Sequence, residues 1–419
     1  MVLLRRAGAV ACLLLAAVGA WAQDLSAEQK ASVLEGIKDV VENRAFVPGV
    51  DFSKWSEFIA KRQEDLDKAA TVPAFGQVIN TALRDFGFSH IRLLSPRAAA
   101  TRNRTSVITS GAAVGPVEEG LTVRMVREGS PAAAAGIKQG EVIIKVDGTP
   151  AKDPAQLEGD EGKKLKLEIK TAEGTTKEVD VELKRISTVR PETLTWLNDK
   201  VAVLRVFTFA AGYGRQNIET LMQEAAAKKA ETLVLDLRSN GGGAVNNLNH
   251  LLSLLMPDQT DYGVFISKPV FENFKTANPG KEPTLNNVVA WVPNKTKTRI
   301  RQSTPPFTGK VVVLINRGSA SASEITAAAL KEKRNALIFG TQSAGAVLAS
   351  VFRTLPEGFS LQYPVSDYVT VGGVRLEGNP VKPDHEVSGP VVDGKDPVHA
   401  KVLEVLGFTQ PATPPPANP

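Results

Sequence analysis

The strongest constraint on the fold is a strand, turn and helix pattern in residues 311–330. Val311–Ile315 is an apolar, β-branched run typical of a buried strand, and the alanine-rich segment ending at Leu330 is typical of a helix. Three serines, Ser319, Ser321 and Ser323, lie where strand gives way to helix. Hydroxyl groups there lie near unpaired N–H groups and the positive end of the helix dipole, which stabilise a negative oxygen. Because a capping serine suits the same place, nucleophile and cap both stay open.

The first 22 residues are typical of a secretory leader. Arg5 and Arg6 precede an apolar run from Ala7 to Val18, and an Ala-x-Ala site ends at Ala22. We therefore expect an exported protein, periplasmic or extracellular. The chain's single cysteine, Cys12, would leave with the leader, so the mature chain would contain no disulfide.

Charge and hydropathy exclude two classes of partner. The formal net charge is +5, it falls by two when the leader is removed, and it is spread along the chain. Such a balance argues against a nucleic-acid partner. No later apolar run is long enough to cross a bilayer, so we expect no stable membrane insertion after cleavage. The proline-rich residues 409–419 are predicted to be a disordered tail.

The remaining chain divides into three predicted domains. Residues 23–105 form a helical N-terminal domain, with apolar positions such as Val33, Ile37 and Val40 at helical spacing and a polar linker over residues 97–104. Residues 106–187 show the mixed strand and helix pattern of an α+β domain. Residues 188–408 alternate strands and helices, which predicts an α/β domain with a central sheet. No role can be assigned to the polar stretch from Asp258 to Lys310.

Residues 106–187 resemble a bacterial PDZ domain. The resemblance is carried by the series SPAAAAGI, beginning at Ser130, and GEVIIKVDG, beginning at Gly140. It implies a groove that binds the C-terminus of a peptide or protein as an added strand. A PDZ domain that serves only as a packing module stays open as the alternative.

A second turn supports the nucleophile hypothesis for Ser321. DLRSNGGG, ending at Gly243, follows a predicted strand, and glycines there let the backbone approach a substrate closely. Together with GSASASEI it resembles the C-terminal processing peptidases, including the tail-specific proteases. The resemblance implies a serine endopeptidase without metal or cofactor, acting on peptide or protein substrates. Ser321 would be the nucleophile, and Ala322 with Gly242 or Gly243 would supply the oxyanion N–H groups. Oligomer formation is left open.

The usual general base of that family is absent. Its lysine falls on Ala346, which cannot accept a proton. The segment containing Ser89 and His90 resembles tricorn-type relatives, in which a histidine at this place is the base. Glu377, shortly before a Pro-Asp pair, matches their orienting glutamate. The resemblance therefore implies a catalytic set of Ser321, His90 and Glu377, with Ser89 assisting.

Three alternatives remain. The other histidines, His250, His385 and His399, fit packed or surface positions better than a base, with His385 held in reserve. A Ser-Lys enzyme using Lys331 or Lys333 would need a lysine about three turns along the helix that Ser321 begins. A catalytically inactive PDZ-containing binding or carrier protein is the third, because the same fold occurs in the interphotoreceptor retinoid-binding protein.

Overall fold

The computed structural model describes residues 24–292, 296–297 and 305–408. Within these, the chain divides into two compact units. One contains residues 108–186 with the short segments 24–26 and 70–74, and the other contains residues 27–69, 75–107 and the remainder from residue 187. The predicted leader and the predicted proline-rich tail both lie outside the described residues.

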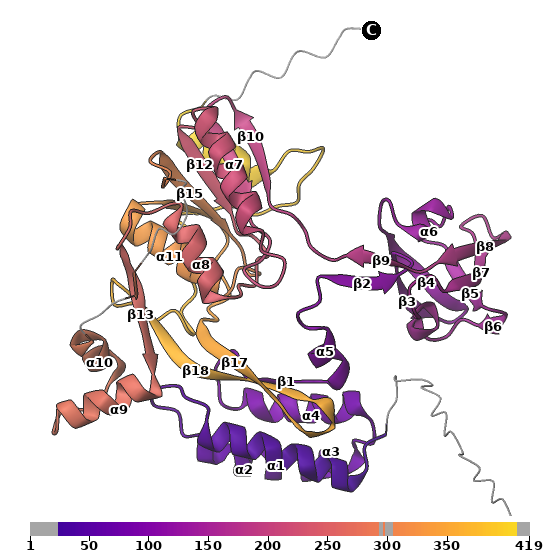
Figure 1. Ribbon diagram of the computed structural model, residues 1–419, viewed down its shortest axis with the longest axis horizontal. Helices are drawn as coiled ribbons and strands as arrows, with labels where there is room; N and C mark the ends of the chain where they lie inside the picture. The colour runs from indigo at the N-terminus through magenta and orange to yellow at the C-terminus, as the bar shows by residue number, and fades with distance from the viewer. Residues whose placement is uncertain (1–23, 293–295, 298–304, 409–419) are drawn as a thin grey trace, which may run out of the picture. The chain divides into compact units, whose positions relative to one another are not determined.

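Helices of the N-terminal region pack through the apolar positions that the sequence predicts. Val33, Ile37, Val40 and Val41 are all buried on one face of α1. In Figure 1, α1 and α4 run along the sheet that contains β18, and the rings of Phe75 and Phe359 meet at 5.8 Å. The helices are α1 (Ala27–Asn43), η1 (Phe52–Lys54), α2 (Trp55–Ala60), α3 (Gln63–Lys68) and α4 (Val72–Arg84).

The expected linker over residues 97–104 is wrong, because its first half is a short helix. Helix α5 spans Pro96–Thr101, with Ser95 as N-cap accepting from the N–H of Ala98 at 3.3 Å and a proline in the first turn. A capping serine followed by proline and three alanines is a helix-start signal. Arg102 is therefore the C-cap residue of a defined helix.

Residues 112–182 form the sheet that the PDZ resemblance implies. Five strands pair antiparallel in the order β3-β4-β5-β7-β8, and β6 pairs with β5. Alternate residues such as Leu121, Val123 and Ile143 fill a core of their own. The elements are β3 (Ala112–Val117), β4 (Gly120–Val126), α6 (Pro131–Ala134), β5 (Val142–Val146), β6 (Thr149–Pro150), η2 (Pro154–Leu157), β7 (Lys164–Lys170) and β8 (Thr176–Glu182). Strands β2 (Ser106–Thr109) and β9 (Lys184–Ser187) pair with each other.

The expected central sheet is present, in the order β10-β11-β12-β15-β16-β19. The pairs from β11 to β19 are parallel, and β10 adds an antiparallel edge. Its strands are β10 (Thr193–Asn198), β11 (Val201–Arg205), β12 (Thr232–Asp236), β15 (Lys310–Ile315), β16 (Leu337–Gly340) and β19 (His385–Glu386), and its helices are α7 (Arg215–Ala227), α8 (Val245–Ser253), α11 (Ala322–Arg334) and α12 (Pro397–Val405).

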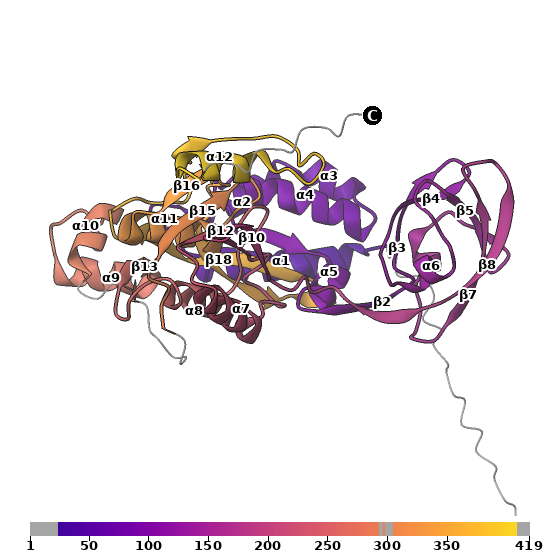
Figure 2. The ribbon, with the colours of Figure 1, turned by 90° about the horizontal axis from the view of Figure 1, so that it is seen from above.

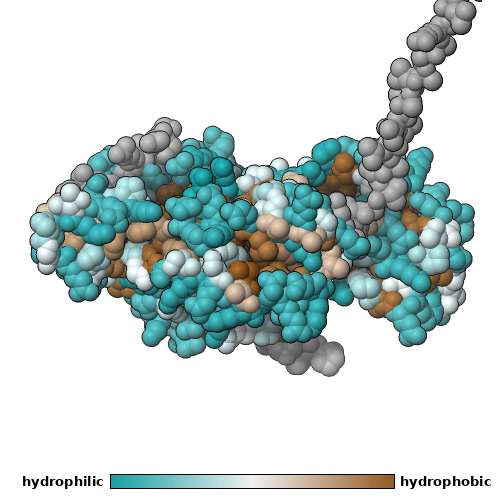
Figure 3. Space-filling view, turned by 90° about the horizontal axis from the view of Figure 1, so that it is seen from below, coloured by the Kyte–Doolittle hydropathy of each residue, from teal (hydrophilic) through white to brown (hydrophobic). Residues whose placement is uncertain are grey.

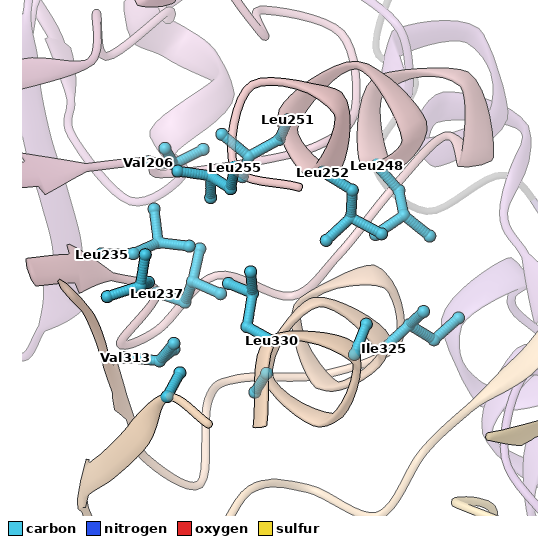
Figure 4. Packing of buried hydrophobic residues seen from close by; sticks show 14 of the residues in the cluster. Val206, Leu235, Leu237, Leu248, Leu251, Leu252, Leu255, Val313, Ile325 and Leu330 are labelled. Atoms are coloured by element: carbon cyan, nitrogen blue, oxygen red, sulfur yellow. The ribbon is translucent and has the colours of Figure 1, made fainter. Parts of the chain in front are cut away.

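Both faces of this sheet are covered, as a parallel sheet requires. In Figure 2 the sheet lies between α12 on one side and α7 and α8 on the other. Neighbouring residues of β15 alternate between the two cores, Val313 towards α8 and α11 and Val312 towards α12. Figure 4 shows the first core, where leucines of α8 such as Leu251 lie opposite Ile325 and Leu330 of α11.

A second sheet is built from distant segments. Strand β18 is its centre and pairs antiparallel with β1, β13 and β17, while β14 pairs with β13. The stretch from Asp258 to Lys310, which had no assigned role, supplies β13 and two helices. The bounds are β1 (Arg92–Leu94), β13 (Asp261–Ser267), α9 (Lys268–Ala277), α10 (Leu285–Trp291), β14 (Thr296–Lys297), β17 (Leu348–Thr354), η3 (Pro356–Gly358) and β18 (Ser360–Thr370).

The face drawn in Figure 3 is mostly hydrophilic and is interrupted by apolar patches. Across the described residues, no helix combines the length and the apolar character that crossing a bilayer requires.

Candidate active site

Ser321 lies in a strained turn between β15 and α11. It is the N-cap residue of α11 with φ 56° and ψ −117°, a positive φ that non-glycine residues rarely adopt. Its N–H group donates to the carbonyl of Ala346 at 2.9 Å and to Glu324 Oε2 at 3.0 Å. Strain of this kind persists only where surrounding contacts impose it, and it is common at functional sites.

The three serines of the turn differ in their partners. Ser319 Oγ donates to the carbonyl of Leu237 at 2.9 Å, and Ser323 Oγ donates to the carbonyl of Asn240 at 2.8 Å. Both serines are fully buried and fasten this turn to the glycine-rich turn. Of the three, Ser321 is the one that lines the neighbouring pocket.

The glycine-rich turn lies directly against Ser321. A Cβ atom on Gly242 would come within 2.7 Å of Ser321 Cβ and 2.9 Å of the Ala322 nitrogen. The N–H of Gly242 is already used, since it donates to Asn240 Oδ1 at 3.0 Å. Within the described part of the chain, the N–H groups of Gly243 and Ala322 have no acceptor. Of the two glycines that the sequence left open, Gly243 therefore has the free donor.

Ser89, His90 and Glu377 form one hydrogen-bonded chain. Ser89 Oγ lies 2.6 Å from His90 Nδ1 and donates to Glu377 Oε2 at 2.8 Å. Glu377 Oε1 also accepts from the N–H of Ser89 at 2.6 Å, and Oε2 accepts from the N–H of Val347 at 2.7 Å. Sequence reasoning expected Glu377 to orient the histidine with help from Ser89; the structure instead interposes Ser89 between them.

This chain of hydrogen bonds fixes the neutral tautomer of His90. An ionised carboxylate only accepts, so the Ser89 hydroxyl proton points to Glu377 and Ser89 Oγ accepts from Nδ1–H. The opposite ring nitrogen, Nε2, then carries the lone pair. Burial lowers the pKa of His90, with the nearby charge of Arg92 acting in the same direction, while the charge of Glu377 raises it. A neutral ring with a free lone pair is the form a general base needs.

His90 and Ser321 line one pocket of about 630 Å³, together with Gly241–Gly243 and Ala322. All of these residues belong to the same compact unit. No hydrogen bond joins Ser321 Oγ to the ring of His90 among the described contacts. Catalytic hydrogen bonds are often long before a substrate is bound.

Ala346, which stands where the family's usual lysine would be, also lies at this site. The carbonyl of Ala346 accepts from Ser321 N–H, so residue 346 contacts Ser321, as the family resemblance implies. No lysine appears in the described pocket lining, and Lys331 pairs with Asp384 at 2.5 Å. No group of histidine, cysteine and carboxylate side chains among the residues searched could hold a metal ion.

The remaining histidines lie outside this pocket. His250 is buried, with Nδ1 2.8 Å from the hydroxyl of Tyr213 and Nε2 3.1 Å from Glu219. The His385 ring stacks on Phe339 at 4.6 Å, and His399 lies 3.7 Å from an Asp396 oxygen. These contacts fit the packed positions that the sequence favours for them.

Sequence reasoning missed Glu324, a fully buried carboxylate that contacts Ser321. It accepts from Ser343 Oγ at 2.5 Å and from the N–H groups of Gly345 at 2.7 Å and Ala346 at 2.9 Å, besides that of Ser321. It thereby fastens residues 343–346 to the start of α11. A serine followed three residues later by glutamate is a capping-box pattern, and this signal could have identified it.

Comparison with known proteins identifies both the α/β region and the PDZ region of this chain. Residues 200–387 match the model of peptidase family S41, and residues 122–171 match a PDZ domain model. The chain is 29% identical over 381 residues to the chloroplastic C-terminal processing peptidase of Tetradesmus obliquus, covering 84% of this chain and 76% of the relative. It is 27% identical over 264 residues to the carboxy-terminal processing protease CtpA of Bacillus subtilis, covering 61% and 51%. The chain thus spans about three quarters of the first relative and half of the second.

A solved structure shows the same fold. The tricorn protease aligns with a TM-score of 0.52 at 16% identity, covering 90% of this chain and 36% of that one. This likeness concerns the fold alone. This chain thus has the S41 protease fold over residues 200–387 and a PDZ domain over residues 122–171, and it is similar to C-terminal processing peptidases.

Proposed function

We propose that this protein is an exported serine endopeptidase that cleaves peptides or proteins through a Ser-His-Glu set rather than a Ser-Lys pair. The observation that carries the proposal is the hydrogen-bonded chain from Glu377 through Ser89 to His90 Nδ1, which leaves Nε2 free in the pocket that Ser321 lines. A serine needs an adjacent base to be a good nucleophile. His90 is the titratable base in the described lining of that pocket.

In the proposed reaction, Ser321 Oγ attacks the scissile carbonyl carbon and its proton passes to His90 Nε2. The imidazolium keeps its Nδ1–H bond to Ser89, and the negative charge of Glu377 stabilises it through that hydroxyl. His90 then gives the proton to the leaving amine as the C–N bond breaks. Water, deprotonated by the same ring, hydrolyses the acyl-enzyme and restores Ser321.

The oxyanion formed in the first step needs two donors. The free N–H groups of Gly243 and Ala322 suit this role, since both belong to turns that meet at Ser321. Where such a donor has been removed from an enzyme, the loss is roughly 3–4 kcal/mol of transition-state stabilisation. Ala322 also begins α11, so its N–H is one of the unpaired groups at the helix start.

The two competing hypotheses lose support in this geometry. The inactive-carrier hypothesis rested on the alanine at position 346, and a neutral, oriented His90 in the same pocket supplies another base. The Ser-Lys hypothesis needs Lys331 or Lys333 in reach, whereas Lys331 is engaged with Asp384 and neither lysine lines the described pocket.

Labelling with a fluorophosphonate probe tests the proposal. We expect the wild-type protein to be labelled and Ser321→Ala to be silent, with labelling in His90→Ala reduced at least a hundredfold because general bases contribute roughly 10²–10⁴. His385→Gln is the matched control, because this histidine lies outside the pocket lining and should leave labelling unchanged. Normal labelling in His90→Ala, or loss in His385→Gln, would reject His90 as the base.

The leader and the PDZ domain complete the proposal. Export predicts that protein recovered from the periplasm or medium begins at Gln23, which N-terminal sequencing would detect. An intact Met1 in the exported fraction would contradict this. We further propose that the PDZ domain presents substrate C-termini to the peptidase. Amidating the C-terminus of a protein substrate should then slow its cleavage, and equal rates would argue against this role.

A further inference from the structure

The pocket at Ser321 is lined by two arginines, Arg92 and Arg102, while no aspartate or glutamate appears in its described lining. Resting on the proposed function, we propose that this pocket selects peptides that place a carboxylate beside an apolar residue, with Arg92 and Arg102 as its specificity-determining residues. The carboxylate can belong to an aspartate or glutamate side chain or to the peptide's own C-terminus.

The two arginines contact one row of residues that crosses three adjacent strands: Arg92 belongs to β1, and Arg102 reaches the row from the C-terminal end of α5. In the register of the second sheet, Gln362 of β18 lies opposite both Arg92 of β1 and Phe352 of β17. Arg92 Nε donates to Gln362 Oε1 at 2.8 Å, and the guanidinium carbon of Arg102 lies 3.5 Å from the centroid of the Phe352 ring. An arginine held by a neutral amide or an aromatic face keeps other N–H donors free for a carboxylate.

The guanidinium groups of Arg92 and Arg102 have no acidic partner within the described residues. Neither Arg92 nor Arg102 forms an ion pair with any described acidic residue. Glu324 and Glu377 hydrogen-bond to lining residues Ser321 and Val347 but are not part of the described lining, and each already accepts hydrogen bonds from backbone and hydroxyl groups. A carboxylate entering the pocket therefore meets unpaired guanidinium groups first.

The rest of the lining is largely apolar. Side chains of Leu248, Phe265, Ile325 and Leu348 contribute to it. Because an apolar wall favours an apolar side chain and bars a bare anion from much of the surface, the fit is to a peptide of mixed character. Small free anions would gain only the arginine contacts.

Binding to the Ser321→Ala protein tests this without requiring cleavage. Three fluorescein-labelled peptides of alanine, leucine and valine, about ten residues long, would be compared by fluorescence anisotropy. The first has a central glutamine and an amidated C-terminus, the second replaces glutamine by glutamate, and the third keeps glutamine but has a free C-terminus. Hydrogen bonds to charged groups, discounted for exposure, predict roughly fivefold to tenfold tighter binding of at least one carboxylate peptide.

The arginines are tested in the same background. Combining Arg92→Gln with Arg102→Gln should abolish the preference, whereas Arg104→Gln, an exposed arginine outside the lining, should preserve it. A gain for the second peptide identifies a side-chain carboxylate, and a gain for the third identifies a terminal one. Absence of any preference overturns the inference. A preference that survives in the double variant would also overturn it, since the preference would then come from the PDZ domain.

A wild-type protein that binds selectively but never cleaves would reject the proposed function and leave this inference standing.

Discussion

Replacing Glu377 by glutamine removes a negative charge while keeping the size of the side chain. The carboxylate accepts three hydrogen bonds, from Ser89 N–H at 2.6 Å, Ser89 Oγ at 2.8 Å and Val347 N–H at 2.7 Å. Glutamine has one acceptor oxygen, so either orientation turns its NH₂ group towards a backbone N–H. Hydrogen bonds to charged groups contribute about 1.5–3 kcal/mol. A loss of that size in the transition state lowers kcat/KM by roughly 10- to 100-fold.

The pH dependence gives the same variant a second, sharper readout. The charge of Glu377 raises the pKa of His90 against the larger lowering by burial, so removing that charge lowers the pKa further. His90 acts as a base only when neutral, and activity is therefore lost as the pH falls through its pKa. The acidic limb of the kcat/KM profile should then move to lower pH in Glu377→Gln.

The assay is the pH profile of peptide hydrolysis for the wild type, Glu377→Gln and Glu386→Gln. Glu386 is exposed and lies outside the pocket lining, so its variant should match the wild type. A Glu377→Gln enzyme with kcat/KM within twofold of wild type and an unmoved acidic limb would refute the role of this carboxylate.

Further variants test the turns around Ser321. Ser89→Ala removes the hydroxyl between His90 and Glu377, so kcat/KM should fall roughly 10- to 100-fold with little change in circular dichroism; full activity would show that the hydroxyl is dispensable. In Gly242→Ala, the new Cβ would lie 2.7 Å from the Ala320 carbonyl oxygen at a φ of +88°, which predicts a loss of about 2–5 kcal/mol in the free energy of unfolding, measured with urea. Gly241→Ala is its control, since a Cβ there meets nothing within 4 Å, and equal losses in both would contradict the close approach. Glu324→Gln should lower the free energy of unfolding by at least about 1–3 kcal/mol, because a buried N–H loses its acceptor. The control is Glu332→Gln, at an exposed position on the same helix, which should change this free energy little. Equal effects of the two variants would contradict the special role of Glu324.

Much of the central sheet could be predicted from the sequence because its strands are buried on both faces. Val311–Ile315 is apolar at every position and Val201–Leu204 is apolar up to Arg205, and the structure places these runs in β15 and β11. The helices between them show the apolar spacing expected of one packed face. The local pattern of apolar residues is enough to predict a strand or helix where that pattern agrees with the residues that the fold buries.

The second sheet could not be predicted in the same way. Strand β13 acquires its role by pairing with β18, about 100 residues later, and β1 pairs with β18 from still further away. Its register, which sets Arg92 opposite Gln362, depends on contacts that no local pattern encodes. The helix at Pro96–Thr101, by contrast, had a capping serine and a proline as signals and was missed because its alanine and arginine content resembled a linker.

For the candidate site, the sequence supplied the residues but not their connections. Ser89, His90 and Glu377 were chosen by resemblance, and the order of hydrogen bonds from Glu377 to Ser89 to His90 became visible only with side chains in place. The choice between Gly242 and Gly243 likewise needed the structure, because the Asn240 side chain occupies the N–H of Gly242.

In the proposed mechanism, His90 takes the proton of Ser321. The most direct test is the second-order rate constant for formation of the fluorophosphonate adduct on Ser321, followed by intact-mass spectrometry across pH in wild type and His90→Ala. We expect a wild-type rate that falls at acid pH with the protonation of His90. In His90→Ala the rate should be lower by roughly 10²–10⁴ and should lack that limb. A His90→Ala protein that reacts at the wild-type rate, with the same acidic limb, would contradict this mechanism.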